Sequence, residues 1–398
     1  MRILLICNKS PYPPREGGPI AINMMVEGLL QAGHRVKVLA MNTNKYFVRS
    51  EDIPVDYASK TGIEFINVDL RVRWVKALEN LITNRSYHIE RFISHAFRSR
   101  LIEILKKDEF DIIQFEMLYT TPYLETAKRY SKARIIFRAH NIEHLIWERI
   151  AETSPGLLKK LYLRQLVKSL KKYELSVIPK FDGIAAITEN DAKFFRNYNS
   201  QVIAIPFGID LTDYPAPIPN QGPVSLFSIG AMNWIPNAEG IRWFLENVWP
   251  DIHKQFPSLK YHIAGREMPA WMQAFKYENV VIEGEVADAM DFMHKHTIMI
   301  VPLFSGSGIR IKIIEGMATG KTIISTTIGA EGIGYRNREN ILIADEPCEF
   351  FEMISVCIDD PYLAGRIGEN AGLLIRQQYD RDPIIRQLTG FYKIIGTD

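Results

Sequence analysis

Short hydrophobic runs alternate with amphipathic stretches over nearly all of the 398 residues. The short runs are typical of buried parallel strands, and the stretches between them have helical periodicity. The first half predicts strands at 2–7, 35–40, 63–68, 111–115, 134–138, 183–188 and 202–205. The second half predicts strands at 224–230, 259–265, 279–284, 297–302, 322–327 and 340–345. This alternation of strands and helices predicts an α/β protein with parallel sheets.

The rhythm breaks between residues 206 and 223, a stretch that contains five prolines and predicts a stiff linker. We therefore predict two Rossmann-like, doubly wound domains, 1–210 and 211–378. A helix in 379–398 is expected to pack back on the first domain. Open sheets of this kind bind ligands at the carboxyl ends of their strands, so the loops that follow strands are the candidate sites.

Composition and charge narrow the class of protein. Hydrophobic residues make up 47% and charged residues 24%, which argues against long disorder, and the net charge of +2 argues against a nucleic-acid binder. Residues 1–215 carry 32 Lys and Arg against 24 Asp and Glu. This basic half can face an anionic membrane or acceptor, or it can complement an acidic second domain; both interpretations stay open.

The cysteines and the N-terminal residues predict a cytoplasmic protein without a metal. Cys7, Cys348 and Cys357 have neither the number nor the spacing of a disulfide framework or a metal site. Met1 leads directly into a strand-like run, so no signal peptide is expected.

Gly17 and Gly18 follow the first strand, and a helix is expected to begin at about Pro19. Glycines before a helix N-terminus allow backbone amides to approach a phosphate or a sugar. The alternative is a tight strand-to-helix turn. No GxGxxG motif is present, which disfavours a dinucleotide-dependent enzyme.

His140 and Asn141 follow directly after the strand at 134–138. His140 is placed where it can exchange a hydrogen bond with a sugar hydroxyl, and Asn141 beside it is a candidate substrate-binding residue. In the alternative interpretation, Asn141 caps the next helix and the histidines, including His144, are solvated. Glu143 falls in the first helical turn, where the helix dipole alone favours a carboxylate.

The strongest candidate site follows the strand at 297–302. Glycine and serine form a small loop there, a helix is expected from about Ile309, and cations and a carboxylate follow. Such a loop and helix N-terminus favour an anion, to which arginine and lysine add donors, while a carboxylate can accept bonds from two ribose hydroxyls. The alternative is a surface ion pair between Lys312 and Glu315. The predicted substrate-binding and cationic residues are Ser305, Gly306, Ser307, Gly308, Ile309, Arg310, Lys312 and Glu315.

At these residues the sequence resembles the retaining glycosyltransferases of family 4, also called group 1, which have the two-domain GT-B fold. The family pattern GSGxRxKxxEAMAxGxPVVST stands here as GSGIRIKIIEGMATGKTIIST. GG at 17–18, GH at 33–34, HNIE at 140–143, IGAMNWIPNAEGIRWF at 229–244, GAEGI at 329–333 and ENILIAD at 339–345 extend the resemblance over nearly the whole chain.

The resemblance implies sugar transfer from a UDP- or GDP-sugar to a glycan or lipid-linked acceptor, without a metal or other cofactor. Glu315 would bind the ribose, and Arg310 and Lys312 would act on the diphosphate. His140 would contact the donor sugar. Gly17 and Gly18 would close over the diphosphate or acceptor, and the base would meet the backbone around Glu283, Gly284 and Val286.

Two departures from the family pattern leave alternatives open. Ser307 stands where a glutamate is frequent, eight residues before Glu315, as in a subgroup with the GxRxK pattern. Residues 232–234 replace an arginine and a lysine that often follow the first strand of the second domain. The competing hypotheses are a sugar-nucleotide epimerase of the same architecture and a non-catalytic sugar-nucleotide-binding protein.

The basic stretch at 155–178 has two interpretations as a helix. Its lysines and arginine, interleaved with leucine and tyrosine, can dock on the inner face of an anionic membrane. Alternatively, the helix packs on the core and its basic face is solvated.

Overall fold

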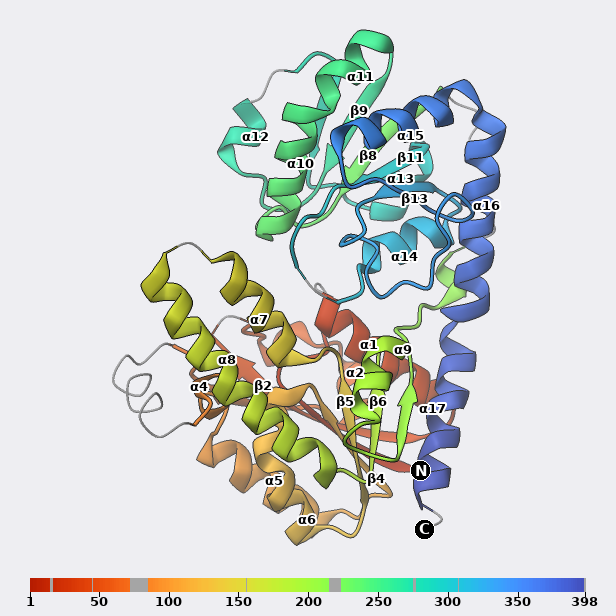
Figure 1. Ribbon diagram of the computed structural model, residues 1–398. Helices are drawn as coiled ribbons and strands as arrows, with labels where there is room; N and C mark the ends of the chain where they lie inside the picture. Colours follow the sequence, from red (N-terminus) through yellow and green to blue (C-terminus); the bar gives the residue numbers. More distant parts are fainter. Residues whose placement is uncertain are drawn as a thin grey trace. The chain divides into compact units, whose positions relative to one another are not determined.

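The computed structural model describes residues 1–398 except 15–16, 45, 72–84, 155, 215–222, 275–276, 307 and 397–398. The chain folds into two compact units (Figure 1). The first unit comprises Met1–Ile209 and Arg381–Asp398, and the second comprises Asp210–Asp380. Residues 215–222 of the stretch predicted as a linker lie outside the described residues.

The first unit contains a seven-stranded parallel sheet in the order β3-β2-β1-β4-β5-β6-β7. The strand order reverses between β1 and β4, which makes the carboxyl ends of these two strands a topological switch point. Every strand predicted in the first half is found, with shifts at its ends. The strands are β1 Arg2–Cys7, β2 Arg35–Thr43, β3 Glu64–Val68, β4 Ile112–Glu116, β5 Arg134–Ala139, β6 Gly183–Ala186 and β7 Val202–Ala204.

Helices cover both faces of this sheet. Those of the first unit are α1 Gly17–Gln31, α2 Val55–Thr61, α4 Tyr87–Glu90, α5 His95–Lys107, α6 Leu124–Tyr130, α7 Glu143–Thr153, α8 Leu157–Val177, α9 Glu189–Phe195 and α17 Arg381–Gly396. Because side chains alternate along a strand, Leu4 and Ile6 of β1 enter one core while Ile3 and Leu5 enter the other. The second core includes α17, which packs against α1.

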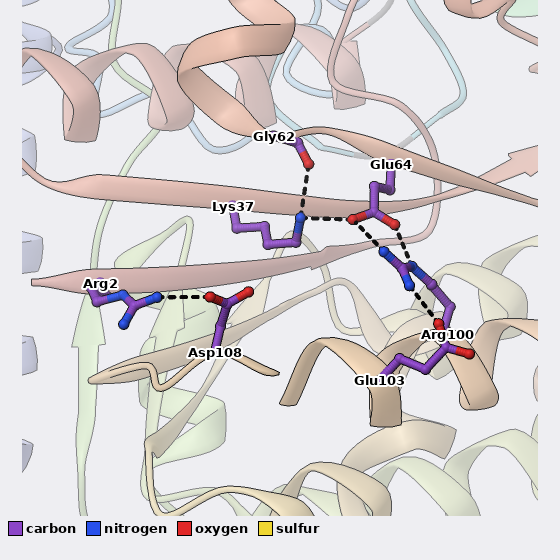
Figure 2. Close-up of polar contacts among 7 residues, drawn as sticks. All are labelled: Arg2, Lys37, Gly62, Glu64, Arg100, Glu103 and Asp108. Atoms are coloured by element: carbon purple, nitrogen blue, oxygen red, sulfur yellow. Dashed lines mark hydrogen bonds and ion pairs between the residues drawn. The ribbon is translucent and has the colours of Figure 1, made fainter. Parts of the chain in front are cut away.

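Ion pairs fasten the outer strands of this sheet to α5 (Figure 2). Lys37 of β2 and Arg100 of α5 both bond the Glu64 carboxylate of β3, at 2.7 and 2.5 Å. Burial raises the pKa of Glu64, but the bonds from Arg100 and Lys37 outweigh it and hold the pKa below its ordinary value. Arg2 of β1 pairs with Asp108, just after α5, at 3.0 Å. Because these side chains are partly exposed, each pair contributes about 1 kcal/mol or less to stability.

The second unit contains a six-stranded parallel sheet in the order β10-β9-β8-β11-β12-β13, so its switch point lies between β8 and β11. Its strands are β8 Ser225–Ile229, β9 Lys260–Ala264, β10 Val280–Gly284, β11 Ile298–Val301, β12 Thr322–Ser325 and β13 Leu342–Ile343. Its helices are α10 Ile235–Asn247, α11 Trp249–Gln255, α12 Ala270–Ala274, α13 Ala289–Lys295, α14 Ile311–Ala318, α15 Pro347–Asp359 and α16 Pro361–Gln378. The prediction of two parallel α/β sheets is confirmed.

Two glycines allow the carboxyl edge of this sheet to close tightly. A side chain at Gly265 would place its Cβ 1.8 Å from the carbonyl oxygen of Gly230, so the ends of β8 and β9 approach each other closely only because this position is glycine. Gly240 of α10 likewise lies against the carbonyl of Pro302, after β11. Among the described residues, no helix is long and apolar enough to cross a bilayer.

Candidate functional site

A pocket of about 250 Å³ opens at the carboxyl edge of the second unit's sheet. Its walls come from the ends of β8, β9 and β10, from α13, and from α14. The lining residues are Ile229, Gly230, Ala231, Gly265, Arg266, Glu285, Val286, Ala289, Met293, Lys312 and Glu315. The pocket therefore lies at the topological switch point, where open α/β sheets bind their ligands.

Lys312 and Glu315 both enter this pocket because they lie one turn apart on α14. Lys312 donates from Nζ to Asn237 Oδ1 of α10 at 2.8 Å. Burial, with a smaller contribution from the charge of Arg310, lowers its pKa to about 7. Neither Lys312 nor Glu315 takes part in an ion pair within the described part of the chain. The alternative prediction of a Lys312–Glu315 surface pair is thus wrong.

Glu315 is held by a neutral partner. The Tyr214 hydroxyl donates to Glu315 Oε1 at 3.2 Å. Burial raises the pKa of this carboxyl, and the bond from Tyr214 opposes the rise. A carboxylate oriented in this way at a pocket wall can accept two hydroxyl hydrogen bonds.

Arg310 has a different place from the one expected. The helix α14 begins at Ile311 rather than at Ile309, and Arg310 is its N-cap. The Arg310 guanidinium turns back, bonding the carbonyl of Gly308 and lying 5.4 Å from the Trp234 ring, and it does not line the pocket. Burial lowers its pKa to about 10.

The glycine-rich loop lies beside Arg310 rather than in the pocket wall. Gly306 and Gly308 have positive φ angles of 104° and 81°, a conformation that disfavours other residues. Ser305 is exposed, and Ser307 lies outside the described residues. None of the described loop residues lines the pocket.

The segment after β10 contributes to the pocket in part. Val286 lines it, as does Glu285, whereas Glu283 and Gly284 do not. The Glu283 side chain instead pairs with His262 Nδ1 at 2.8 Å. Gly284 accepts a backbone bond from Gly265 at 2.7 Å and so ties β10 to β9.

Arg266 and Asn237 are functional candidates that the sequence analysis missed. Arg266 directly follows Gly265 at the end of β9 and adds a second cation to the pocket. A strand followed by Gly-Arg is a signal that could have identified it. Asn237 holds Lys312, and only the packing of α10 on α14 reveals this contact.

In the first unit, His140 is buried and paired. Its Nε2 lies 2.7 Å from Glu116 Oε2, at the end of β4. Burial lowers the pKa of His140; the bond to Glu116 opposes this effect, and the charges of Arg138 and Lys9 reinforce it. Sequence reasoning missed Glu116, whose only signal was a carboxylate at the carboxyl end of a buried strand.

The start of α7 is organised by a carboxylate from α8, not by Asn141. Ile142 is the N-cap and provides no side-chain bond. Instead, Glu174 accepts the backbone N–H groups of Glu143 and His144, both at 3.0 Å, and pairs with His144 Nδ1 at 2.7 Å. The alternatives of an Asn141 cap and solvated histidines are wrong, because Glu174 accepts the N–H bonds of the helix start and both histidines are buried, His140 beside Glu116 and His144 beside Glu174.

Glu143 is a second buried carboxyl at this helix start. It accepts a bond from the Tyr119 hydroxyl at 2.8 Å. Burial raises its pKa to about 7, with a contribution from the negative charge of Glu174. The group is therefore poised to change charge near neutral pH.

Gly17 and Gly18 form the start of α1, which begins at Gly17 rather than at Pro19. The Lys9 side chain lies against Gly18, where a Cβ would be 2.9 Å from Lys9 Cε. Lys9 Nζ also lies 4.5 Å from the centre of the Tyr46 ring. Gly18 thus makes room for a cation near the α1 N-terminus.

Comparisons with known proteins agree with this architecture. Residues 17–213 match the family described as Glycosyltransferase Family 4, and residues 223–360 match the family described as Glycosyl transferases group 1. Together these two family matches span both units, so the chain is a glycosyltransferase of the group 1, family 4 type.

Within the described ranges, no three His, Cys, Asp or Glu side chains are grouped as a metal site needs.

Similar proteins extend the comparison over the whole chain. An "Uncharacterized 44.6 kDa protein in cps region" of Klebsiella pneumoniae is 22% identical and aligns over 97% of this chain and 98% of its own length. Sucrose-phosphate synthase of Thermosynechococcus elongatus has a TM-score of 0.68 at 14% identity, with 99% of both chains covered. Anabaena Alr3699/HepE, solved with UDP-glucose, has a TM-score of 0.64 at 13% identity, with 98% of both chains covered. The predicted GT-B fold is confirmed.

Proposed function

We propose that this glycosyltransferase moves a sugar from a UDP- or GDP-sugar to a glycan or lipid-linked acceptor with retention, without a metal or cofactor, in surface-polysaccharide biosynthesis. The observation that carries the proposal is the pair Lys312 and Glu315, which enter one pocket from one helix and have no ion-pair partner within the described ranges. The cps-region relative supports the polysaccharide role, and HepE, solved with UDP-glucose, supports the donor class.

In this proposal each pocket residue has one task. Glu315 accepts hydrogen bonds from the ribose hydroxyls, and Lys312 binds the diphosphate. Because the pKa of Lys312 is about 7, a bound diphosphate favours the protonated form of the lysine. The protonated lysine in turn stabilises the departing diphosphate as a leaving group. Arg310, at the N-cap of α14 and outside the pocket lining, contributes positive charge, and Glu285 and Val286 border the base.

The transfer step exchanges one bond for another on the same face of the sugar. The bond from the acceptor oxygen to the anomeric carbon forms as the bond to the diphosphate oxygen breaks. The hydroxyl proton passes to the departing diphosphate, so no base is required. His140 bonds a hydroxyl of the donor sugar.

The first test measures which nucleotide binds and whether Glu315 is needed. Saturating UDP, at about 100 times its Kd, is expected to raise the melting temperature of the wild type by about 3–7 °C, because it binds only the folded state. Glu315→Ala should abolish this shift. Glu369→Ala, an exposed position on α16, is the matched control and should retain it. A shift with GDP alone would assign the donor to guanosine, and no shift with either nucleotide would contradict the proposal.

A second test separates transfer from the two competing hypotheses. Incubation with the nucleotide sugar and an acceptor glycan should release the nucleoside diphosphate and yield an α-linked product from an α-linked donor. Conversion of the sugar without any acceptor would favour an epimerase. Nucleotide binding without turnover, over a panel of donors and acceptors, would favour a binding protein.

The proposal includes peripheral contact with an anionic membrane through α8. Leu163, Leu166 and Leu170 of α8 are buried, whereas Leu157 and Leu161 near its start are exposed. The exposed face also carries Lys159, Arg164, Lys168, Lys171 and Lys172. Residue 155 lies outside the described residues.

This membrane contact is tested by flotation with vesicles of phosphatidylglycerol and phosphatidylcholine. Binding should require the anionic lipid and fall as salt rises, because the lysines are exposed to counterions. Leu161→Gln should weaken it, while Leu373→Gln, an exposed leucine of α16, should not. Binding that is equal to neutral vesicles, or absent, would remove this part of the proposal.

A further inference from the structure

Arg138, Glu116 and His140 form a buried charged cluster at the carboxyl ends of β4 and β5. Arg138 and Glu116 are paired residues in the register of these strands and are both 0% exposed. Arg138 Nε lies 3.8 Å from Glu116 Oε2, the oxygen that also contacts His140. The cationic Arg138 and the titratable His140 therefore share the Glu116 carboxylate.

The rest of the cluster fixes that carboxylate. Gln114, two residues earlier on β4, donates from Nε2 to Glu116 Oε1 at 2.5 Å. The Tyr392 hydroxyl of α17 donates in turn to Gln114 Oε1. A chain of hydrogen bonds thus runs from the last helix to His140, and both Glu116 oxygens are engaged.

The buried guanidinium supplies the positive charge that Glu116 needs. Within the described part of the chain, none of the three side-chain nitrogens of Arg138 makes a hydrogen bond. The guanidinium instead forms an ion pair with the Glu116 carboxylate. With this charge in place, His140 does not have to be protonated to balance Glu116. Its Nε2–H donates to the carboxylate, and Nδ1 has no protein partner among the described residues.

We propose that Glu116 and Arg138 are positioning residues that hold His140 as a neutral imidazole, with Nε2–H bound to Glu116 and Nδ1 turned toward substrate as a hydrogen-bond acceptor. The assignment of the acceptor role rests on the proposed function, since the bond that Nδ1 accepts would come from a hydroxyl of the donor sugar. A histidine held in one tautomer presents only one kind of hydrogen bond, and so it selects a hydroxyl that donates.

The charged and titratable neighbours of His140 determine what each variant should do. They are Glu116 of β4, Arg138 of β5, Lys9 after β1, Cys7 of β1 and Tyr392 of α17. Burial raises the pKa of both Cys7 and Tyr392, so these two stay neutral. Burial therefore opposes the charged form of His140 most strongly, Glu116 favours it, and the charges of Arg138 and Lys9 add to the effect of burial.

The test is a ¹⁵N and ¹H NMR titration of the histidine side chains, assigned with His140→Gln. The wild type should show the neutral Nε2–H form of His140 at pH 7. Glu116→Gln should lower the His140 pKa, and Arg138→Met should raise it by about one unit or more, because each removes one of two opposing charges. Arg134→Met, on the same strand without an ion pair in the described ranges, is the matched control and should leave the pKa unchanged.

Activity provides the second readout. Arg138→Met should lower kcat/KM about threefold to tenfold at pH 7, the loss of one hydrogen bond, with recovery at higher pH as the imidazole loses its proton. A structural defect would not recover with pH. The order of pKa values, Glu116→Gln below wild type below Arg138→Met, supports the proposal.

An Nδ1–H tautomer or an imidazolium in the wild type at pH 7 would overturn the proposal, and this measurement needs no variant to fold. Equal His140 pKa values in the three proteins would also overturn it. These measurements use no nucleotide sugar, so their failure is distinct from a failure of UDP or GDP to bind.

Discussion

The polar groups at the two sheet edges differ in what neutralises them. In the first unit, Glu116 and Glu174 are completely buried and contact several donors from neighbouring strands and helices. In the second unit, the hydrogen bonds of Lys312 and Glu315 to other described side chains go only to neutral groups, Asn237 and Tyr214. The first edge is built to keep a fixed geometry, while the second carries charges that a ligand of opposite charge or with hydroxyl groups would satisfy.

The largest expected loss of stability follows from removing a buried carboxylate of the first unit. Glu116→Ala leaves Arg138 and His140 without their carboxylate, and the free energy of unfolding should fall by about 3–5 kcal/mol. Urea denaturation measures the loss. Glu103→Ala, which removes one of the two carboxylate partners of Arg100 at an exposed position, should cost about 1 kcal/mol or less. Equal losses in the two variants would show that the buried cluster is not charged.

Because of Glu143, we expect the free energy of unfolding to depend on pH. Its folded pKa of about 7 lies above the ordinary 4.5, so the native state binds this proton more tightly and loses stability as pH rises between these values. Glu143→Gln cannot ionise and should escape this loss, which amounts to at most about 3 kcal/mol. Denaturation of both proteins at pH 5 and pH 8 should show the variant gaining relative to the wild type at pH 8. A constant difference would contradict the prediction.

Replacing Lys312 should change the affinity for UDP and the free energy of unfolding in different ways. Lys312→Met should weaken UDP binding about 10- to 100-fold at pH 7, the loss of a charged hydrogen bond. Since no buried counter-ion is lost, its unfolding free energy should stay equal or rise. Calorimetric titration and denaturation measure the two effects.

The same lysine should make nucleotide affinity depend on pH. Above its pKa of about 7, binding a diphosphate requires proton uptake, so the wild-type affinity for UDP should fall between pH 7 and pH 9. The affinity of Lys312→Met should remain level over this interval. Parallel pH profiles in the two proteins would assign the dependence to another group.

The smallest expected effect concerns the neutral partner of Glu315. Tyr214→Phe removes the hydroxyl that lies 3.2 Å from the carboxylate, and UDP binding should weaken by about 1 kcal/mol or less. Isothermal titration compares it with Tyr362→Phe, a fully accessible tyrosine on α16. A loss as large as that of Lys312→Met would mean that Tyr214 itself contacts the ligand.

Local pattern was sufficient for the elements and for part of the site. Apolar runs and helical periodicity predicted every strand that the described residues form, because a buried parallel strand requires apolar residues on both faces. The spacing of Lys312 and Glu315 predicted their common direction, because it is set by the helical turn. Element ends were less accurate, as α14 begins at Ile311 because Arg310 serves as its N-cap.

The sequence by itself therefore determined the two parallel sheets and the residue types at the carboxyl ends of their strands. Only the tertiary structure decided which of these side chains meet. Glu116 contacts His140 from a neighbouring strand, and Tyr392 reaches Gln114 across 278 positions of sequence. Glu174, from another helix, accepts the N–H bonds that the alternative interpretation gave to Asn141. The reason is physical: a buried charge needs a partner, and the partner comes from whichever element the packing brings near, which no local pattern encodes.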